Sequence, residues 1–480
     1  MQAVRRIAKN TIVMITGQIL GKFLSLIFVI YVARYLQAEG FGILSFALAF
    51  AGMFHIFADI GFYELTIREV ARDKKLAGKY IGNIMVLKVI LVTFVFGLMC
   101  LTINAMNYPI LTVTVVYVVG LSIVFNAFSI ISNAIFQAFE RLEFITIGTV
   151  LRGVLLVIGG IVAIYNKWDI LAFAFLYLLA SLAVFVYSLS LMFVKFAKPK
   201  FEIDLDFWKF VLKEGNPFWA SAVLTTIFYN IDKVMLSAIV SNEAVGYYSA
   251  SYRIISTLHI ISISFIASIF PVTSRLYVSS KDKLKFTFER SFKYMAILGV
   301  TIGVTVTLLS EKIIILIYGE GYRPSISALQ ILVWAEAILF FNATIRNLFK
   351  SINRQIIILY TLIPGVSSNV VLNWLLIPKF SFIGASFATV VARFIMLVLS
   401  FIWLMRTEYK LSSGTMINTL RILLIALVVW FAINIINIGD GSILSVLFIG
   451  GFFILLYLLK IIDDVDKRLI KDILSSVRLK

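Results

Sequence analysis

Cysteine, histidine and proline are scarce in this sequence. It has one cysteine (Cys100), two histidines and seven prolines in 480 residues. One cysteine cannot form an intramolecular disulfide bond, so a disulfide-stabilised scaffold is excluded. His55 and His259 lie in different apolar segments without Cys, Asp or Glu at ligand spacing, and we expect no metal site. Charged residues make up 14% of the chain, against about 25% in a soluble domain, which excludes an ordinary soluble protein.

Apolar residues are abundant instead. They supply 61% of the chain, and the mean hydropathy is +1.01. A membrane-spanning helix needs about 20 predominantly apolar residues, and fourteen such runs can be read along the sequence. We therefore predict an all-α integral membrane protein. The fourteen predicted transmembrane helices cover residues 11–34, 40–66, 82–104, 110–138, 143–165, 169–194, 216–240, 246–272, 288–308, 324–347, 355–377, 382–405, 416–437 and 442–461.

Basic residues outnumber acidic ones, 43 to 25, which gives a formal net charge of +18. With a cytoplasmic amino terminus, the cytoplasmic connections carry 32 of these cations and the outer connections carry five. This asymmetry follows the positive-inside rule, so the charge indicates topology, and binding to nucleic acid is not expected. We predict a multi-pass protein of the cell (plasma) membrane with both termini cytoplasmic. The first apolar run, Thr11 to Val32, is too long for the core of a cleavable signal peptide.

The connections between the predicted spans are short. The longest outer connection runs from about Ser310 to Arg323, which leaves no room for an outer catalytic domain. The longest cytoplasmic connection contains DFWKFVLKEG (206–215), an amphipathic segment that we expect to lie at the membrane interface.

A short internal repeat indicates how the spans are grouped. AEGFGILSFALAF (38–50) follows the first span and NEAVGYYSASYRI (242–254) follows the seventh; Glu, Gly and Ser recur at a separation of 204 residues. An even number of spans per repeat gives both halves the same orientation, related by an axis along the membrane normal. We predict two six-helix bundles with a MATE-like arrangement. The predicted parts are 1–200 (first bundle), 201–410 (second bundle, with the interfacial helix) and 411–480 (two further helices and a cytoplasmic tail).

These segments also carry a family likeness. The stretch 231–254 and the opening stretch 9–62 resemble polysaccharide flippases, the Wzx-like branch of the multidrug/oligosaccharidyl-lipid/polysaccharide exporter superfamily. LIYGEGY (316–322) and 369–393 look like later landmarks of that family. The resemblance covers essentially the whole chain. It implies a flippase that moves lipid-linked sugars from the cytoplasmic to the outer leaflet, with a central and often cationic cavity and no catalytic motif.

Six cations remain once those assigned to the connections are counted, and they lie further inside the predicted spans. Lys88 and Arg152 are within about two helical turns of the cytoplasmic face, so we expect their side chains to snorkel to it. The other four lie deeper, and charges at that depth are typical of substrate pathways. We predict that these four hold a phosphate or pyrophosphate of the cargo, arginine through its fork of donors and lysine as a point charge. They are Lys22, Lys233, Arg253 and Arg393.

Three acids of the spans are candidates for ion pairs or for coupling: Asp59, Asp232 and Glu336. Asp232 and Arg253 fall at similar depth on consecutive spans, which permits an ion pair that only fixes helix packing. Asp59 and Glu336 have two interpretations: structural carboxyls, for example as partners of Lys22 or Arg393, or protonatable groups that couple transport to a proton or sodium gradient. No other cofactor is expected. Four amides are helix-packing groups or sugar contacts: Asn126, Asn133, Asn230 and Asn342.

Other functions share part of this pattern. A cation-coupled multidrug exporter of the same superfamily would favour acids in its cavity, and a peptidoglycan lipid-precursor flippase is a close alternative. A membrane glycosyltransferase, polymerase or ligase would need a large outer loop with catalytic groups. We therefore predict a transporter and not an enzyme. Its expected partners are a lipid-linked glycan, membrane lipids, and glycosyltransferases or a polymerase of the same pathway.

Overall fold

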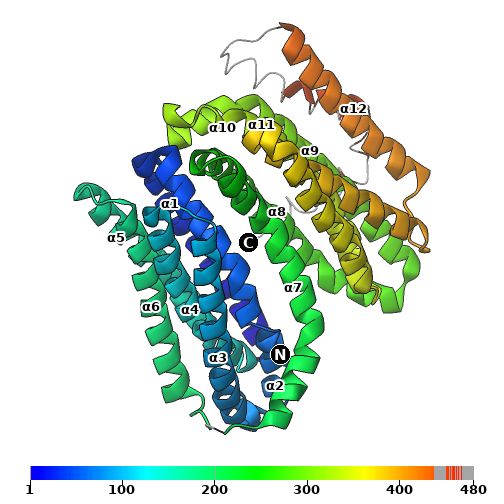
Figure 1. The fold of residues 1–480 in the computed structure, drawn as a ribbon. Coiled ribbons are helices and arrows are strands. Elements are labelled where there is room, and N and C mark those ends of the chain that lie inside the picture. Colours follow the sequence, from blue (N-terminus) through cyan, green and yellow to red (C-terminus); the bar gives the residue numbers. More distant parts are fainter. Residues whose placement is uncertain are drawn as a thin grey trace. The chain divides into compact units, whose positions relative to one another are not determined.

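Within the described residues, the computed structural model of the chain is built from helices and the turns between them. It describes residues 2–200, 202–436, 450–452, 454–455, 457–459, 461, 463 and 466. The predicted all-α fold class is confirmed. The helices are α1 (Gln2–His55), α2 (Phe62–Arg72), α3 (Ala77–Ala105), α4 (Ile110–Ala138), α5 (Leu142–Tyr165), α6 (Ile170–Lys195), α7 (Leu205–Ile239), α8 (Asn242–Ser279), α9 (Lys281–Tyr318), α10 (Ser325–Ser351), α11 (Ile356–Met405) and α12 (Ser413–Ile436), with 3₁₀ turns at Ile56–Ala58, Lys74–Leu76 and Glu320–Tyr322 (Figure 1).

Ten of the described helices are long and apolar enough to cross a membrane. α1 and α11 each hold two predicted spans, joined at one residue with positive φ: Gln37 (φ 56°) in α1 and Ser381 (φ 51°) in α11. Gln37 Nε2 also donates to the carbonyl of Arg34 (2.6 Å), which satisfies an acceptor at the end of the first span. α12 covers most of the predicted span 416–437. The predicted span 442–461 and the tail beyond it lie largely outside the described residues.

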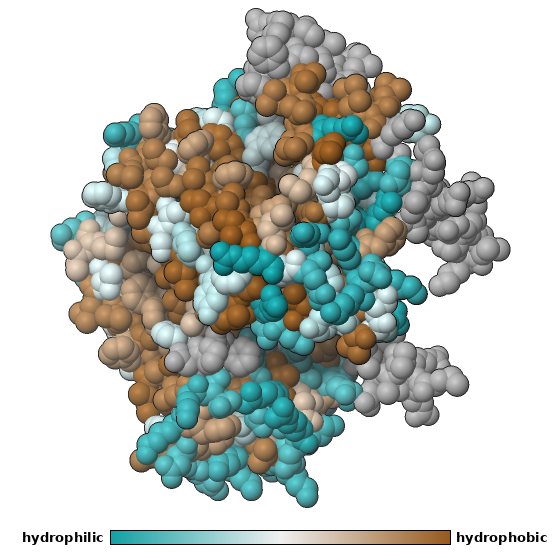
Figure 2. All heavy atoms as spheres, turned by 90° about the vertical axis from the view of Figure 1, so that its right-hand side faces the viewer, coloured by the Kyte–Doolittle hydropathy of each residue, from teal (hydrophilic) through white to brown (hydrophobic). Residues whose placement is uncertain are grey.

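Apolar side chains are exposed along these helices, as a lipid-facing surface requires. Figure 2 shows extensive apolar surface on the face that it draws, with hydrophilic residues gathered at the lower end of the view. The chain is a multi-pass membrane protein.

The described chain divides into two compact units, and the predicted division at residues 200 and 410 stays a prediction. Unit 1 comprises Met1–Arg253, Ile317–Tyr322 and Val370–Ala385, and unit 2 comprises Ile254–Leu316, Arg323–Asn369 and Ser386–Lys480.

In unit 1, α4 packs on α6 and α1 packs on α5 (Figure 1). One apolar core of this unit joins α2, α3, α4 and the start of α7, with Phe62, Ile81, Phe136 and Val211 almost fully buried. Burial of such side chains contributes about 1.5–3 kcal/mol each in water, whereas in lipid close packing and hydrogen bonds carry more of the helix association.

The repeat seen in the sequence forms a reciprocal contact in unit 1. A Cβ added at Gly42 would lie 1.7 Å from the carbonyl oxygen of Asn242, and one added at Gly246 would lie 1.9 Å from that of Ala38. Ala38 and Asn242 are themselves related by the same 204-residue separation as the two glycines. The two contacts are therefore equivalent under the repeat, and each requires glycine because a backbone carbonyl occupies the place of a side chain.

The segment Ile317–Tyr322 packs on α1 within the same unit. The Tyr322 hydroxyl donates to the Ala33 carbonyl (2.9 Å), and Arg34 Nε donates to the Ile317 carbonyl (2.7 Å). These bonds fix the end of the first predicted span, next to the break at Gln37.

The interfacial segment predicted at 206–215 is helical, but it is the first part of α7 and not a separate helix. Asp204 caps α7 by accepting from the Phe207 N–H (2.9 Å), and its Oδ2 pairs with Lys79 Nζ at 2.7 Å. The hydrogen bond from Lys79 and that from the Phe207 backbone hold the pKa of Asp204 below its ordinary value. Because this N-cap lies before residues 206–215, the predicted interfacial segment and the rest of α7 form one continuous helix.

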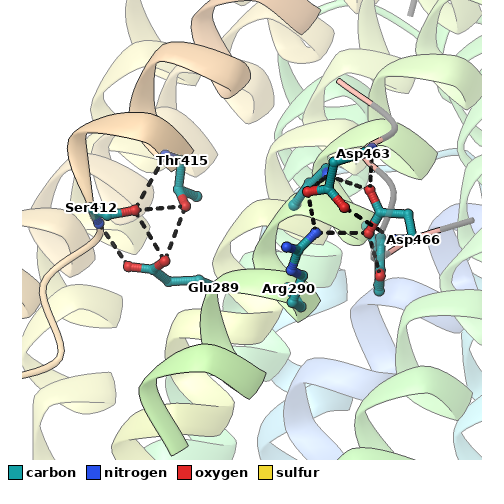
Figure 3. Close-up of polar contacts among 8 residues, drawn as sticks. Glu289, Arg290, Ser412, Thr415, Asp463 and Asp466 are labelled. Carbon is teal, nitrogen blue, oxygen red and sulfur yellow. Dashed lines mark hydrogen bonds and ion pairs between the residues drawn. The ribbon is translucent and has the colours of Figure 1, made fainter. Parts of the chain in front are cut away.

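In unit 2, an apolar core joins α9, α10 and α12 through residues such as Phe292, Phe349 and Ile422. Two polar clusters flank this core on α9 (Figure 3). Glu289 accepts from the Ser412 N–H (2.8 Å) and the Thr415 hydroxyl (3.2 Å), which fixes the start of α12. Its neighbour on α9 binds two acids of the C-terminal segment: Arg290 Nη1 contacts Asp463 and Asp466 at 2.5 and 2.8 Å.

Candidate functional site

Asp232 is held by neutral donors from two other helices of unit 1. It lies on α7 with only 2% of its surface exposed. The Tyr248 hydroxyl of α8 donates to its Oδ2, and Asn373 Nδ2 of α11 donates to its Oδ1 at 2.6 Å. A buried carboxylate needs such donors, because an unsatisfied one would cost several kcal/mol. The predicted ion pair between Asp232 and Arg253 stays a prediction.

Lys233 and Arg253, predicted to bind substrate, come together in unit 1. Lys233 Nζ lies 4.9 Å from the centre of the Tyr252 ring, a cation–π contact, and Lys233 is close enough to Arg253 for their charges to interact. Arg253 Nη2 donates to the Ser25 hydroxyl of α1. The carboxylate of Asp232 acts on Lys233 more strongly than Arg253 does, but two cations and one anion leave one positive charge in excess, so the arrangement suits an added anion.

Lys22 lies on the same side of α1 as Ser25, because residues three apart in a helix are neighbours on its surface. Its side chain is exposed. We define Lys22, Lys233 and Arg253 as the cation cluster: the last two interact, and the first shares a helix face with the serine that Arg253 contacts. Tyr318 also lies within electrostatic range of Arg253.

The expectation that Lys88 snorkels to the cytoplasmic face is wrong. Lys88 is fully buried, and its Nζ lies 3.0 Å from Asp59 Oδ2 and donates to the Ala127 carbonyl at 2.8 Å. Asp59 Oδ1 accepts from the backbone N–H of Phe62 (2.9 Å), at the start of α2. Asp59, in the turn between the 3₁₀ turn Ile56–Ala58 and α2, is within reach of the ammonium and makes a buried pair available, so the side chain of Lys88 turns inward. Asp59 therefore has Lys88 as a partner, whereas its predicted candidates were Lys22 and Arg393.

Glu336 and Arg393 both lie in unit 2. Glu336 is on α10 with 2% of its surface exposed, and its Oε1 accepts no hydrogen bond from the residues that the structure describes. Arg393, on the second part of α11, is the positive charge that acts on this carboxyl. The structure thus brings Glu336 and Arg393 together in one unit, as one of the two interpretations of Glu336 expected. Arg393 is not in the unit that holds the cation cluster.

Other polar residues of the spans were not singled out as site residues. Tyr248 and Asn373 bind Asp232, and Arg152 Nη1 donates to Asn126 Oδ1 of α4 at 3.0 Å. Depth alone could have found Tyr248, since it lies six residues after the start of α8 and Asp232 lies seven residues before the end of α7. Within the described parts of the chain, no three His, Cys, Asp or Glu side chains are grouped so as to hold a metal ion.

Two family models match the chain. The model described as "Polysaccharide biosynthesis protein" matches residues 7–277, which is more than half of the chain, and the model described as "MatE" matches residues 217–375. The two matches overlap in α7 and α8, where Asp232, Lys233 and Arg253 lie.

The chain is also similar to individual proteins, at low sequence identity. An uncharacterised membrane protein of Methanocaldococcus jannaschii is 27% identical over 62% of this chain, and the match spans 60% of that protein, less than two thirds of its length. A probable low-salt glycan biosynthesis flippase, Agl15 of Haloferax volcanii, is 20% identical over 80% of each chain. Among solved structures, lipid II flippase MurJ in an inward closed conformation has a TM-score of 0.74 at 18% identity, covering 96% of this chain and 100% of that one. At this identity the likeness shows a common fold.

Proposed function

Because the chain belongs to the polysaccharide biosynthesis protein family, we propose that it is a flippase for lipid-linked oligosaccharide or polysaccharide repeat units. It moves them from the cytoplasmic to the outer leaflet by exposing a cation-lined path to each side in turn. The observation that carries the proposal is the cation cluster: the neighbouring Lys233 and Arg253, with Lys22 on the face of α1 that Arg253 contacts, inside otherwise apolar helices.

The physical task explains why cations are retained there. A phosphate-linked sugar cannot cross a hydrocarbon core about 30 Å thick without a polar path, because its charge and hydroxyl groups would lose their hydration. Arg253 offers a planar fork of donors to a phosphate, and Lys233 adds a second positive charge. The apolar tail of the substrate stays in the lipid, so only the headgroup needs the protein.

The wider setting follows from this role. The protein acts as a transporter and not as an enzyme, in the cell membrane, with both termini cytoplasmic. Its substrate reaches it from membrane glycosyltransferases and leaves it toward a polymerase or transferase on the outer side. In unit 2, Arg393 is a further candidate cation for the substrate, and Glu336 is a candidate for coupling to a proton or sodium gradient.

A cation-coupled multidrug exporter is a second candidate. The match of the MatE model to residues 217–375 and the buried Glu336 favour it. Its cargo would be cationic, so the cation cluster would repel it. Uptake of a cationic dye that depends on Glu336 but not on Arg253 would identify this function.

The test is transport of a fluorescent lipid-linked glycan in proteoliposomes. We expect Lys233→Ala and Arg253→Ala each to slow flipping on the order of tenfold, because each loses a charge-assisted contact worth about 1.5–3 kcal/mol. Lys22→Ala should have a smaller effect, since that side chain is exposed. Lys379→Ala, an exposed cation on α11 outside the cluster, is the matched control. Wild-type rates in all three cluster variants would refute the role of the cluster.

A further inference from the structure

Unit 1 also contains a cavity with several polar residues on its wall. It has a volume of about 400 Å³ and is lined by residues of α1, α4, α5 and α6, which lie together in Figure 1. No residue of the cation cluster lines it. Its wall carries His55, Asn126, Asn133, Thr149, Arg152 and Tyr187. We call it the Arg152 cavity.

Among the side chains that the structure describes, Arg152 is the only Lys, Arg, Asp or Glu on the wall of this cavity. It contacts an amide: Arg152 Nη1 donates to Asn126 Oδ1 at 3.0 Å. None of the ion pairs among the described residues includes Arg152, whereas Lys88 pairs with the carboxylate of Asp59. A guanidinium has five N–H donors, and an unpaired charge inside a bundle is costly, so this position calls for an anion.

His55 gives independent support. Its Nε2 is buried and has no hydrogen-bond partner among the residues that the structure describes, and the side chain lines the same cavity. Buried polar nitrogens are rarely left unsatisfied, so a ligand atom or water is expected beside it. The carboxylate nearest in sequence, Asp59, is already bound by Lys88.

The chemistry of the wall selects the ligand. One cation, two amides, hydroxyls and an imidazole, without a carboxylate, fit a group that is negative and has several acceptor oxygens. Phosphate has this character and matches the fork of arginine. A volume of about 400 Å³ exceeds what a bare phosphate needs and lies in the range of small-molecule sites, about 300–1,000 Å³.

We propose that the Arg152 cavity is a binding site for a phosphate group, with Arg152 as its main ligand and His55 and Asn126 beside it. Phe144, near the start of α5, also lines the cavity, and Arg152 lies two helical turns, about 12 Å, further along. The start of α5 follows a connection predicted to be cytoplasmic, so the phosphate enters from that side. The proposal does not rest on flipping, and it stands whether the phosphate belongs to a phospholipid headgroup, a polyprenyl phosphate or free phosphate.

The test measures thermal unfolding of the purified full-length protein with three probes. These are inorganic phosphate in detergent, nanodiscs of phosphatidylglycerol against phosphatidylcholine, and a polyprenyl phosphate in phosphatidylcholine nanodiscs. We expect at least one probe to raise the melting temperature of the wild type, and Arg152→Gln to weaken the apparent affinity about tenfold or more. Arg72→Gln, an exposed arginine on α2, is the matched control and should respond as the wild type does.

The pattern of response identifies the source of the phosphate. A response to inorganic phosphate assigns the site to free phosphate; a response confined to phosphatidylglycerol or to polyprenyl phosphate assigns it to that lipid. Arg152→Lys keeps the charge but loses the fork, so it should retain part of the response. If Arg152→Gln does not fold, Asn133→Trp, which adds a bulky apolar group to the cavity wall and keeps Arg152, should abolish the response instead. No response of the wild type to any probe, or an equal response in these variants, overturns the proposal.

Discussion

Asp59 of unit 1 and Glu336 of unit 2 are both carboxylates inside apolar spans, yet their surroundings differ. Asp59 pairs with the buried Lys88 at 3.0 Å and caps α2 with its other oxygen. Glu336 is 2% exposed, and its Oε1 has no hydrogen-bond donor among the described residues. A carboxylate with both oxygens engaged is fixed in place by its contacts, whereas one with an oxygen that accepts no hydrogen bond can bind a proton or an ion with little rearrangement. The first is thus expected to stabilise the fold, and the second to change its charge during transport.

The largest expected effect comes from breaking the pair of Asp59 and Lys88. Asp59→Asn keeps an acceptor for the Phe62 N–H but leaves the Lys88 ammonium buried without its anion. We expect a loss of about 3–5 kcal/mol in the free energy of unfolding, the usual result of removing one partner of a buried pair. Lys88→Met should lower stability by the same mechanism, and the double variant should be less destabilised than the sum of the two. Unfolding in detergent micelles measures these differences.

An exposed pair gives the control for this prediction. Lys209 and Asp206 of α7 lie 3.5 Å apart and are both largely exposed, so Lys209→Met should cost only about 0–1 kcal/mol. Additive single changes at Asp59 and Lys88, each no larger than that of Lys209→Met, would contradict the structural role of the buried pair.

A third carboxylate, outside the spans, tests what a cationic partner contributes where water is present. Arg290, Lys293 and the backbone N–H of Asp466 bind Asp463, and although burial opposes them they hold its pKa at about 2, below the ordinary 3.8. A depressed pKa stabilises the folded state above the ordinary value, and this contribution disappears as the pH falls from 3.8 toward 2. Because Asp463 is partly exposed, solvent screening limits the contribution to about 1 kcal/mol.

The measurement compares wild type with Asp463→Asn over a pH series. The variant should be less stable at neutral pH, and the difference should disappear as the pH approaches 2. Asp282→Asn, an exposed acid at the start of α9, is the control and should show no such convergence. If the difference in unfolding free energy between wild type and Asp463→Asn stays constant down to that pH, the contact between α9 and the C-terminal segment does not depend on the charge of Asp463.

The sequence predicts where the helices lie in the chain better than it predicts which side chains contact each other between helices. Runs of apolar residues located ten membrane-crossing helices and the breaks near Gln37 and Ser381, because length and hydropathy are local properties. The repeat also identified Gly42 and Gly246, which form the reciprocal contact in unit 1. Depth along a span placed Lys233 beside Arg253, since those residues lie on consecutive helices.

The position of a residue along its span did not predict which side chains from helices distant in the chain contact each other. Lys88 lies near the predicted cytoplasmic face, but which way its side chain turns depends on Asp59, 29 residues earlier. The Arg152 cavity depends on how α1, α4, α5 and α6 pack together, and no spacing within one helix encodes that. Asn373 reaches Asp232 across 141 residues of chain, so the sequence alone gave no reason to connect them.

The smallest expected effect on stability belongs to Glu336→Gln, and this result would sharpen the contrast with Asp59. Glutamine keeps the shape of the side chain and removes a charge that is expensive to bury, so unfolding should change by less than about 1 kcal/mol in either direction. The effect on transport should be larger. Flipping should no longer respond to an imposed pH or sodium gradient, while the rate measured without a gradient should stay the same. Glu311→Gln, a partly exposed acid on α9 that pairs with Arg323, serves as the matched control and should leave the gradient response intact. A gradient response retained in Glu336→Gln would remove Glu336 from coupling, and a loss of several kcal/mol in stability would show that it is as structural as Asp59, with Arg393 as its fixed partner.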